Sequence, residues 1–115
     1  MTSTQREKLE SASRLDRTVR FRDKETGKVE EWGTVVDEVY VIVAEDGDDP
    51  YKHMIQKIRQ TTDSGDQWLY RTGYYTFRAK DKEKLVWGQY AQLLTEIEYK
   101  VLLAKAKAKG WSIFP

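Results

Sequence analysis

Alternation of apolar and polar positions is the dominant pattern in the first half of the chain, and it predicts strands. In residues 18–22, Val19 and Phe21 share one parity while hydroxyl and basic side chains occupy the other, which is typical of a half-buried strand. The turn formers at 25–28 include a glycine, which accepts a positive φ at low cost. The segment therefore predicts a hairpin with Val19 and Phe21 directed toward the core.

A run of β-branched and aromatic residues follows at 29–44, with apolar side chains on both parities. Such a strand is expected to be either central in its sheet or strongly bent. Gly33 and the pair Asp37 and Glu38 interrupt the run, so a bulge or bend is predicted at one of these places.

Residues 51–62 carry two conflicting patterns. Apolar side chains recur there at the i, i+3, i+4, i+7 spacing of a helix: Tyr51, Met54, Ile55 and Ile58. The polar stretch at 61–66 and the aromatic strand after it instead have the form of a hairpin loop and its second arm. Strand is the preferred interpretation, and helix is the open alternative.

Residues 67–78 form the clearest strand, because they are rich in aromatic side chains and lack a helical period. A further strand is predicted at 85–90, and the polar segment 79–84 closes the two into a hairpin. One symmetric register pairs Phe77 with Leu85, Tyr75 with Trp87 and Tyr74 with Gly88. In this register the ring of Tyr74 covers the backbone that Gly88 leaves bare.

The two faces of this hairpin are assigned different roles. The core face collects Leu69, Tyr75, Phe77, Leu85 and Trp87. The opposite face and its surroundings supply the candidate ligand-binding residues, Trp68, Tyr70, Arg71, Tyr74 and Tyr90. These side chains can form a platform that stacks bases, a peptide or a planar ligand. The alternative, in which further structure buries this second face as well, is the favoured interpretation.

The last element is a helix predicted from Glu96 to about Lys109. Thr95 and Glu98 form a capping box at its start, and Gly110 can adopt the left-handed conformation that ends a helix. Four apolar residues at helical spacing are expected to pack on the sheet: Ile97, Val101, Ala104 and Ala108. Leu102 and Leu103 broaden this apolar stripe.

The two ends of the chain carry different signals. Residues 1–16 are polar and predict a flexible tail or a short helix, with Thr4 and Glu7 in capping-box spacing. Large apolar residues near the other end predict that it folds back onto the core: Trp111, Ile113 and Phe114. The remainder, 17–115, is predicted to be a single domain. The fold class is α+β, a small antiparallel, strongly bent sheet or partly open barrel of about five strands with one C-terminal α-helix.

Composition narrows the class of protein. The chain has 115 residues, a formal net charge of +1 and no cysteine. Its length suits one domain, and its near-zero charge gives no long-range field that attracts polyanions. No segment has the apolar length of a membrane span, and the lack of cysteine fits a reducing compartment. We therefore expect a cytoplasmic protein that does not enter a membrane.

Catalytic and cofactor motifs are scarce. His53 is the single histidine, so no histidine and cysteine cluster is available and no metal is expected. The glycines form neither nucleotide-binding loop, the serines occupy no nucleophile elbow, and no cofactor is predicted. The acidic loop at 45–49 lacks EF-hand spacing. Glu98 and Lys100 have the spacing of some metal-dependent nucleases, but they lie on a predicted helix, so a non-catalytic role is favoured.

Two binding functions are favoured, and a third hypothesis is a small enzyme whose other catalytic residues come from a partner or a dimer mate. The leading hypothesis is a non-catalytic binding or adaptor module that engages a protein partner through an aromatic sheet face. The alternative is a small nucleic-acid-binding domain, in which arginine side chains contact phosphates while aromatic rings stack on bases. The candidate phosphate contacts are Arg20, Arg22 and Arg59.

Overall fold

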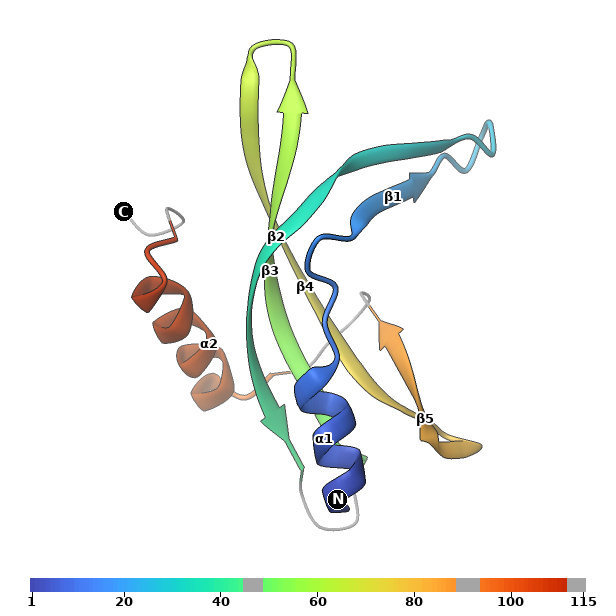
Figure 1. The fold of residues 1–115 in the computed structure, drawn as a ribbon, viewed down its shortest axis with the longest axis vertical. Helices are drawn as coiled ribbons and strands as arrows, with labels where there is room; N and C mark the ends of the chain where they lie inside the picture. The colour runs from blue at the N-terminus through green and yellow to red at the C-terminus, as the bar shows by residue number, and fades with distance from the viewer. Residues whose placement is uncertain (45–48, 89–93, 112–115) are drawn as a thin grey trace. The chain divides into compact units, whose positions relative to one another are not determined.

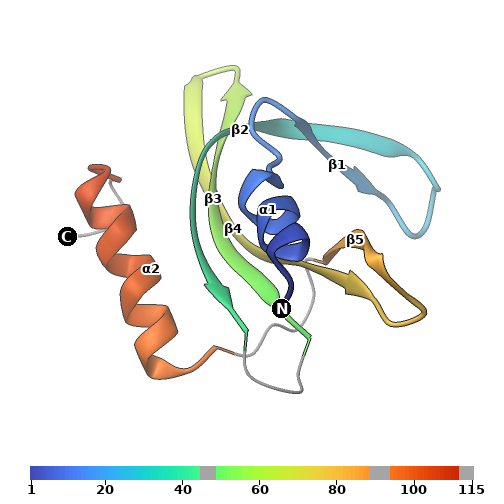
Figure 2. The ribbon, with the colours of Figure 1, turned by 60° about the horizontal axis from the view of Figure 1, so that its bottom comes forward.

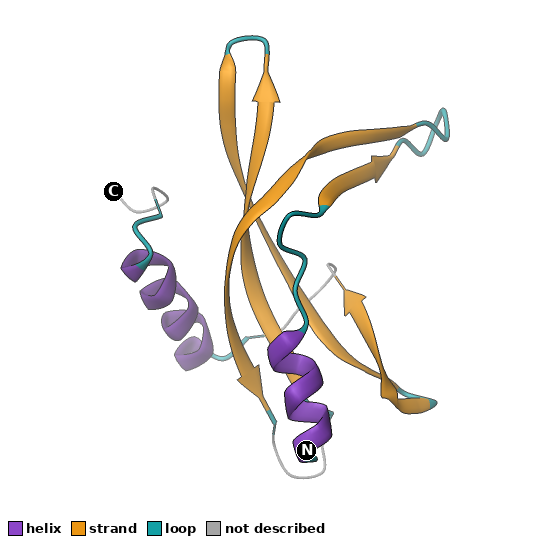
Figure 3. Cartoon of the chain, in the orientation of Figure 1, coloured by secondary structure: helices purple, strands orange, loops and turns teal. Residues whose placement is uncertain are grey.

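The computed structural model describes residues 1–44, 49–88 and 94–111. Five strands form one sheet in the order β1-β2-β3-β4-β5, so strands that follow one another in sequence lie side by side (Figures 1 and 3). The elements are α1 Ser3–Ser11, β1 Thr18–Arg22, β2 Val29–Val43, β3 Tyr51–Thr62, β4 Gly65–Arg78, β5 Asp81–Gly88 and α2 Glu96–Ala108. The predicted α+β class, with a bent antiparallel sheet of five strands and a C-terminal helix, is confirmed. The strand interpretation of residues 51–62 is also confirmed.

The described chain divides into two compact units. Unit 1 is drawn from Met1–Ala12, Val39–Ile55 and Thr72–Pro115, and unit 2 is formed by Ser13–Glu38 and Gln56–Arg71. The strands β2, β3 and β4 each contribute residues to both units.

Unit 1 holds a hydrophobic cluster built on one side of its strands. Leu9 of α1 is fully buried and packs with Met54, Tyr75 and Phe77. Partly buried side chains surround this cluster: Ala12, Tyr40, Ile42, Leu85 and Trp87. Within unit 1, α1 and α2 lie on opposite sides of the strands in both views (Figures 1 and 2). Four of the residues assigned to the core face of the hairpin thus lie in or against this cluster, which confirms their assignment: Tyr75, Phe77, Leu85 and Trp87.

The hairpin of β4 and β5 has the predicted register. Phe77 pairs with Leu85, Tyr75 with Trp87 and Tyr74 with Gly88. The turn is tighter than predicted, because Arg78 already pairs with Asp81, so residues 82–84 form a bulge in β5 instead of part of a long loop.

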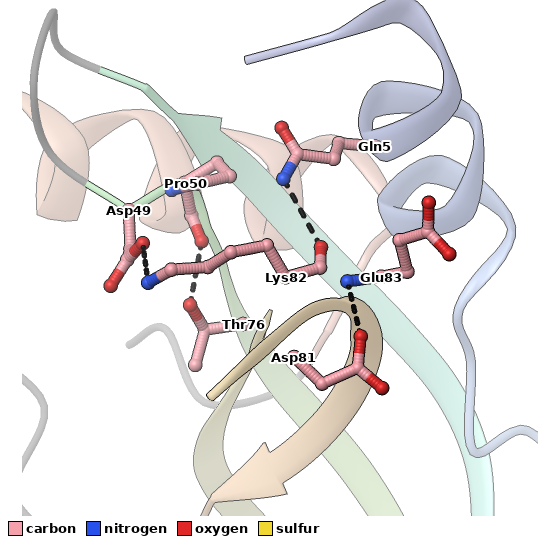
Figure 4. A network of polar contacts seen from close by, with 7 residues as sticks. All are labelled: Gln5, Asp49, Pro50, Thr76, Asp81, Lys82 and Glu83. Atoms are coloured by element: carbon pink, nitrogen blue, oxygen red, sulfur yellow. Dashed lines mark hydrogen bonds and ion pairs between the residues drawn. The ribbon is translucent and has the colours of Figure 1, made fainter. Parts of the chain in front are cut away.

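Polar contacts tie the turn end of this hairpin to its neighbours in unit 1 (Figure 4). The Lys82 carbonyl accepts a hydrogen bond from Gln5 Nε2 of α1 at 3.2 Å, and the Lys82 ammonium lies 2.7 Å from Asp49 Oδ1. Thr76 Oγ1 donates to the Pro50 carbonyl at 2.8 Å, just before β3 begins. These contacts fix the entry to β3 and the start of α1 against the hairpin.

The helix boundaries follow from local capping. In α2, Thr95 and Glu98 form the predicted capping box, and Gly110 adopts a φ of +75° beyond the last turn. In α1 the capping box is formed by Thr2 and Gln5, so the predicted box at residues 4–7 is wrong by half a turn. Glutamine at the third helical position serves as well as glutamate in this motif, which leaves the start ambiguous in the sequence.

The buried face of α2 agrees with the predicted one at Leu102 but not along the main apolar stripe. Leu102 and Ala106 are fully buried, and Trp111 beyond the helix is also buried, as predicted for the chain's return to the core. Ile113 and Phe114 lie outside the described residues. All four side chains of the predicted stripe are exposed: Ile97, Val101, Ala104 and Ala108. Because α2 has apolar residues on more than one side, its helical period alone does not select the side that faces the sheet.

In unit 2, the hairpin of β1 and β2 contains the predicted bulge at Gly33. Val19 pairs with Gly33 while Arg20 pairs with Glu31, so one residue of β2 is left out of the register. A Cβ on Gly33 would lie 2.4 Å from the carbonyl oxygen of Arg59 in β3. Glycine is therefore required here by the close approach of two strands.

Candidate functional site

Unit 2 leaves three of its four aromatic side chains exposed to solvent. The relative solvent exposures of Phe21, Trp32 and Trp68 are 46%, 41% and 43%. The buried apolar side chains of this unit, all of whose residues are described, are Val35 and Ile58. The three rings thus contribute little to the core of the unit that carries them.

Two of these rings stack across the β1–β2 hairpin. The ring centroids of Phe21 and Trp32 are 4.9 Å apart, with 27° between the ring planes. Arg20 and Glu31 form an ion pair of 3.5 Å between the same two strands. The expected burial of Phe21 is wrong, because its side chain is exposed. Phe21 pairs with Glu30 across the hairpin, and its neighbours along β1 are also charged. Phe21 packs on the Trp32 ring and not in a hydrophobic core.

The third ring lies on the β3–β4 hairpin beneath a cation. Lys57 Nζ is 4.5 Å from the centroid of the Trp68 ring, a distance suited to a cation–π interaction. Side chains alternate along a strand, so Lys57, Arg59 and Thr61 share one face of β3. Thr61 Oγ1 donates to Asp66 Oδ1 at 3.2 Å, so Asp66 of β4 lies on the same face as Thr61. Trp68 is two residues beyond Asp66 in β4 and therefore also lies on this face. Arg59 and Trp68 therefore lie on one face.

A groove of about 280 Å³ lies beside Trp32. Trp32 and Arg59 both line it, together with side chains that are mostly polar: Thr18, Glu31, Gly33, Thr34, Gln60 and Thr61. Within the part of unit 2 that the structure describes, the Arg59 guanidinium forms no ion pair or hydrogen bond. The groove thus presents an available cation beside an indole ring.

We call these five residues the aromatic–basic surface: Phe21, Trp32, Lys57, Arg59 and Trp68. Its rings supply apolar area, and its two cations supply hydrogen-bond donors. The unit as a whole is balanced in charge, because it contains nine lysine and arginine residues and nine aspartate and glutamate residues. Unit 2 therefore has no net charge, and Glu31 lines the same groove as Arg59.

The predicted ligand-binding residues are divided between the two units. Trp68, Tyr70 and Arg71 belong to unit 2, Tyr74 belongs to unit 1, and Tyr90 lies outside the described residues. Trp68 is exposed, whereas the other three are half-buried. The platform of all five residues stays a prediction.

Arg71 is part of an interior polar network of unit 2. Its Nε donates to Gln56 Oε1 at 2.8 Å, and Gln56 Nε2 donates to Glu38 Oε2 at 2.7 Å. Glu38 also accepts hydrogen bonds from the Ser13 hydroxyl and the Arg14 backbone amide. This network fastens the segment after α1 to β2 and β3, which gives Arg71 a structural role.

Tyr74 is packed among rings of unit 1. Its ring meets those of Tyr51 and His53 edge-on, with centroid distances of 5.6 Å and 6.4 Å. His53 is buried and stacks on Tyr51 at 5.6 Å. Tyr74 also lies over Gly88 of β5. These contacts favour the interpretation that Tyr74 stabilises the sheet.

The predicted phosphate contacts have different surroundings. Arg20 is paired with Glu31, and Arg22 Nη1 donates to the Gly27 carbonyl at 3.4 Å. Arg59 is exposed and lines the groove. Among the three, Arg59 is the one that lines the groove.

Phe21, Trp32 and Lys57 are the members of the surface that the sequence patterns do not identify as binding residues. Charged neighbours along the same strand do not reveal that Phe21 is exposed, because this alternation is also typical of a half-buried strand. The signal lies across the hairpin, where the residue opposite Phe21 is the charged Glu30. No local signal places Lys57 over Trp68, because that contact depends on the register of β3 and β4.

No group of three His, Asp or Glu side chains among residues 1–44, 49–88 and 94–111 is arranged to hold a metal ion. In the same ranges, neither helix has the length and apolar character needed to cross a bilayer. No protein-family model matches the chain, and neither the curated proteins nor the solved structures include a significantly similar chain.

Proposed function

We propose that this protein is a non-catalytic binding module that engages a protein partner through the aromatic–basic surface of unit 2. The observation that carries the proposal is the exposure of Phe21, Trp32 and Trp68 on a unit that buries few apolar side chains of its own. The proposal includes a cytoplasmic location, which rests on the absence of cysteine from the chain.

The composition of the surface supports a protein partner. Tryptophan and arginine are the residues most enriched among those that dominate protein interfaces, and aromatic rings bury large areas with little loss of side-chain freedom. Trp32 and Trp68 are held by their contacts with Phe21 and Lys57, so less ordering is needed on binding. The balanced charge of unit 2 gives no long-range attraction for a polyanion, which favours a protein over a nucleic acid.

A second candidate is single-stranded nucleic acid, and it has one observation in its favour. Lys57 and Arg59 lie on the same face as Trp68, so a base stacked on the indole ring would have two cations near its phosphates. The salt dependence of binding separates the two functions. Affinity for nucleic acid falls steeply as salt rises, whereas affinity for a protein held by aromatic contacts changes little.

The test is affinity capture from a native lysate, with and without nuclease, using the wild-type chain and two variants. The surface variant combines Phe21→Ser, Trp32→Thr and Trp68→Thr. The control variant, Tyr99→Thr, removes an equally exposed aromatic ring from unit 1. All three proteins are compared at equal amounts of folded bait, and captured proteins are quantified by mass spectrometry.

We expect a protein partner that the wild type and Tyr99→Thr capture equally, in nuclease-treated and untreated samples, and that the surface variant loses at least tenfold. Recovery that disappears after nuclease treatment supports the nucleic-acid candidate and contradicts the proposal. Equal recovery by the surface variant also contradicts it, since the binding surface then lies elsewhere.

A further inference from the structure

The solvent-facing side of α2 carries a continuous apolar seam. Ile97 retains 76% of its exposure and Val101 retains 36%, and two exposed alanines, Ala104 and Ala108, continue the row. The spacing of four, three and four residues is that of the a and d positions in a coiled coil. The opposite side of the helix, with Leu102 and Ala106, already packs in unit 1. The seam is therefore a second apolar face of the same helix.

The seams of two copies of α2 are complementary in side-chain size in only one of the two helix orientations. When two copies of α2 run antiparallel, Ile97 of one copy lies in a layer with Ala108 of the other, and Val101 lies with Ala104. Each layer then combines one large and one small side chain, so all four layers have similar volume. In a parallel pair, two isoleucines would meet in one layer and two alanines in another, which leaves uneven packing and a void.

The charges at the ends of α2 favour the same orientation. The first turn contains Glu96 and Glu98, and the last turn contains Lys105 and Lys107. Glu98 is held in the capping box, and Lys105 donates to the Tyr40 carbonyl. Glu96, in an exposed ion pair with Lys100, and Lys107 are therefore the charges most open to a second copy. An antiparallel pair sets the acidic turn of each copy beside the basic turn of the other, and it also aligns the helix dipoles favourably. A parallel pair would set like charges side by side.

From these features we infer that two copies of this chain associate through an antiparallel pairing of their α2 helices along the Ile97, Val101, Ala104 and Ala108 seam. The 13 residues of α2 span about 20 Å, so the contact is smaller than the roughly 800 Å² per partner of a standard interface. The association is therefore weak and depends on protein concentration. It uses unit 1 and is independent of the proposed partner-binding surface in unit 2.

Disulfide trapping tests the orientation directly, because the natural chain has no cysteine. Two single variants are made, Ile97→Cys and Ala108→Cys, and each is oxidised alone and in an equal mixture. In the antiparallel pair these two positions share a layer, whereas Ile97 and its own copy lie about 16 Å apart along the helix axis. We expect the mixture to give several-fold more disulfide-linked dimer than either variant alone.

The control mixture combines Tyr99→Cys with Ala108→Cys. Tyr99 projects about 160° away from Ile97 around the helix, so this mixture should give only background cross-linking. Dominant self-linking of the single variants indicates a parallel pair and overturns the proposed orientation. Cross-linking of the Ile97 and Ala108 mixture that is no greater than that of the control also overturns it.

Sedimentation of the cysteine-free chain tests the association itself. We expect the average mass of the wild type to rise above the monomer value of 13.5 kDa as concentration increases, while Ile97→Lys stays monomeric. Ile97 is largely exposed, so this variant should keep its fold, which helical circular dichroism checks. Tyr99→Lys adds the same charge off the seam and should still associate. A wild type that stays at the monomer mass, or association that survives Ile97→Lys, contradicts the inference.

Discussion

At the scale of single residues, the β4–β5 hairpin is shaped by two glycines that aromatic rings cover. A Cβ on Gly88 would lie 2.4 Å from the Tyr74 ring, and a Cβ on Gly73 would lie 2.2 Å from the Trp87 ring. The first pair is predictable from the sequence, because Tyr74 and Gly88 are direct neighbours in the symmetric register. The second pair is not, since Trp87 reaches Gly73 diagonally and the direction of its side chain is set by the surrounding core.

We predict that Gly88→Ala lowers the free energy of unfolding by about 1–3 kcal/mol, because the new methyl group has no space beneath the Tyr74 ring. Chemical denaturation measures the change. In a Tyr74→Ala background the same substitution should cost much less, since the ring that blocks the methyl group is gone. Equal losses in the two backgrounds would show that Tyr74 does not cover Gly88.

Lys52 is a buried cation that the sequence does not reveal. Its ammonium donates to the carbonyls of Glu10 and Ala12, where α1 ends, and lies 4.1 Å from the centroid of the Tyr40 ring. A cation at the negative end of a helix dipole is favourable. Its position depends on α1 packing beside β3, a contact between segments far apart in the chain.

We expect Lys52→Met to lower the free energy of unfolding by about 1–3 kcal/mol, because the carbonyls at the end of α1 lose the donor from a buried ammonium. Hydrogen exchange of the α1 amides should quicken as well. Lys84→Met, which removes an exposed ammonium from β5, serves as the control and should change neither quantity. Unchanged stability in Lys52→Met would mean that the ammonium does not hold the end of α1.

At the scale of elements, the ends of α2 are more predictable than the side of it that is buried. The start and end of α2 follow from Thr95, Glu98 and Gly110, which are local signals. The side of α2 that faces the strands is chosen by long-range packing, and Leu102 is preferred over the Ile97 and Val101 row. The strands are predicted well because alternation and turn residues are also local.

Paired substitutions in α2 test which side is buried. Leu102→Ala should lower the free energy of unfolding by about 2–5 kcal/mol, because it opens a cavity at a fully buried position. Val101→Ala, on the exposed seam, should cost less than about 0.5 kcal/mol when measured on the monomer. The reverse order of these two losses would indicate that the seam faces the sheet.

If the aromatic–basic surface is exposed for binding, its tryptophans should contribute little to the stability of the strands. Trp32→Thr and Trp68→Thr should each change the free energy of unfolding by less than about 0.5 kcal/mol, because the rings are exposed and threonine suits a strand. Thermal and chemical unfolding provide the measurement. A loss of several kcal/mol would identify these tryptophans as core residues and remove the basis for a binding surface.

At the scale of the whole molecule, the two units use their apolar residues differently. Unit 1 buries Leu9, Met54 and Phe77 in a common cluster, whereas unit 2 leaves Trp32 and Trp68 exposed. The sequence predicts an aromatic protein without catalytic motifs, but it does not predict this division. Burial depends on which strands receive a covering helix, and that choice is made by contacts between distant segments.

The four tryptophans of the chain allow one direct test of the binding function. Their indole N–H groups give four separate NMR signals, two from unit 2 and two from unit 1, where Trp87 is half-buried and Trp111 is buried. When a captured protein partner is added to the labelled chain, we expect the Trp32 and Trp68 signals to shift or broaden while those of Trp87 and Trp111 stay in place. Unchanged Trp32 and Trp68 signals, with the partner bound, would contradict the proposed function.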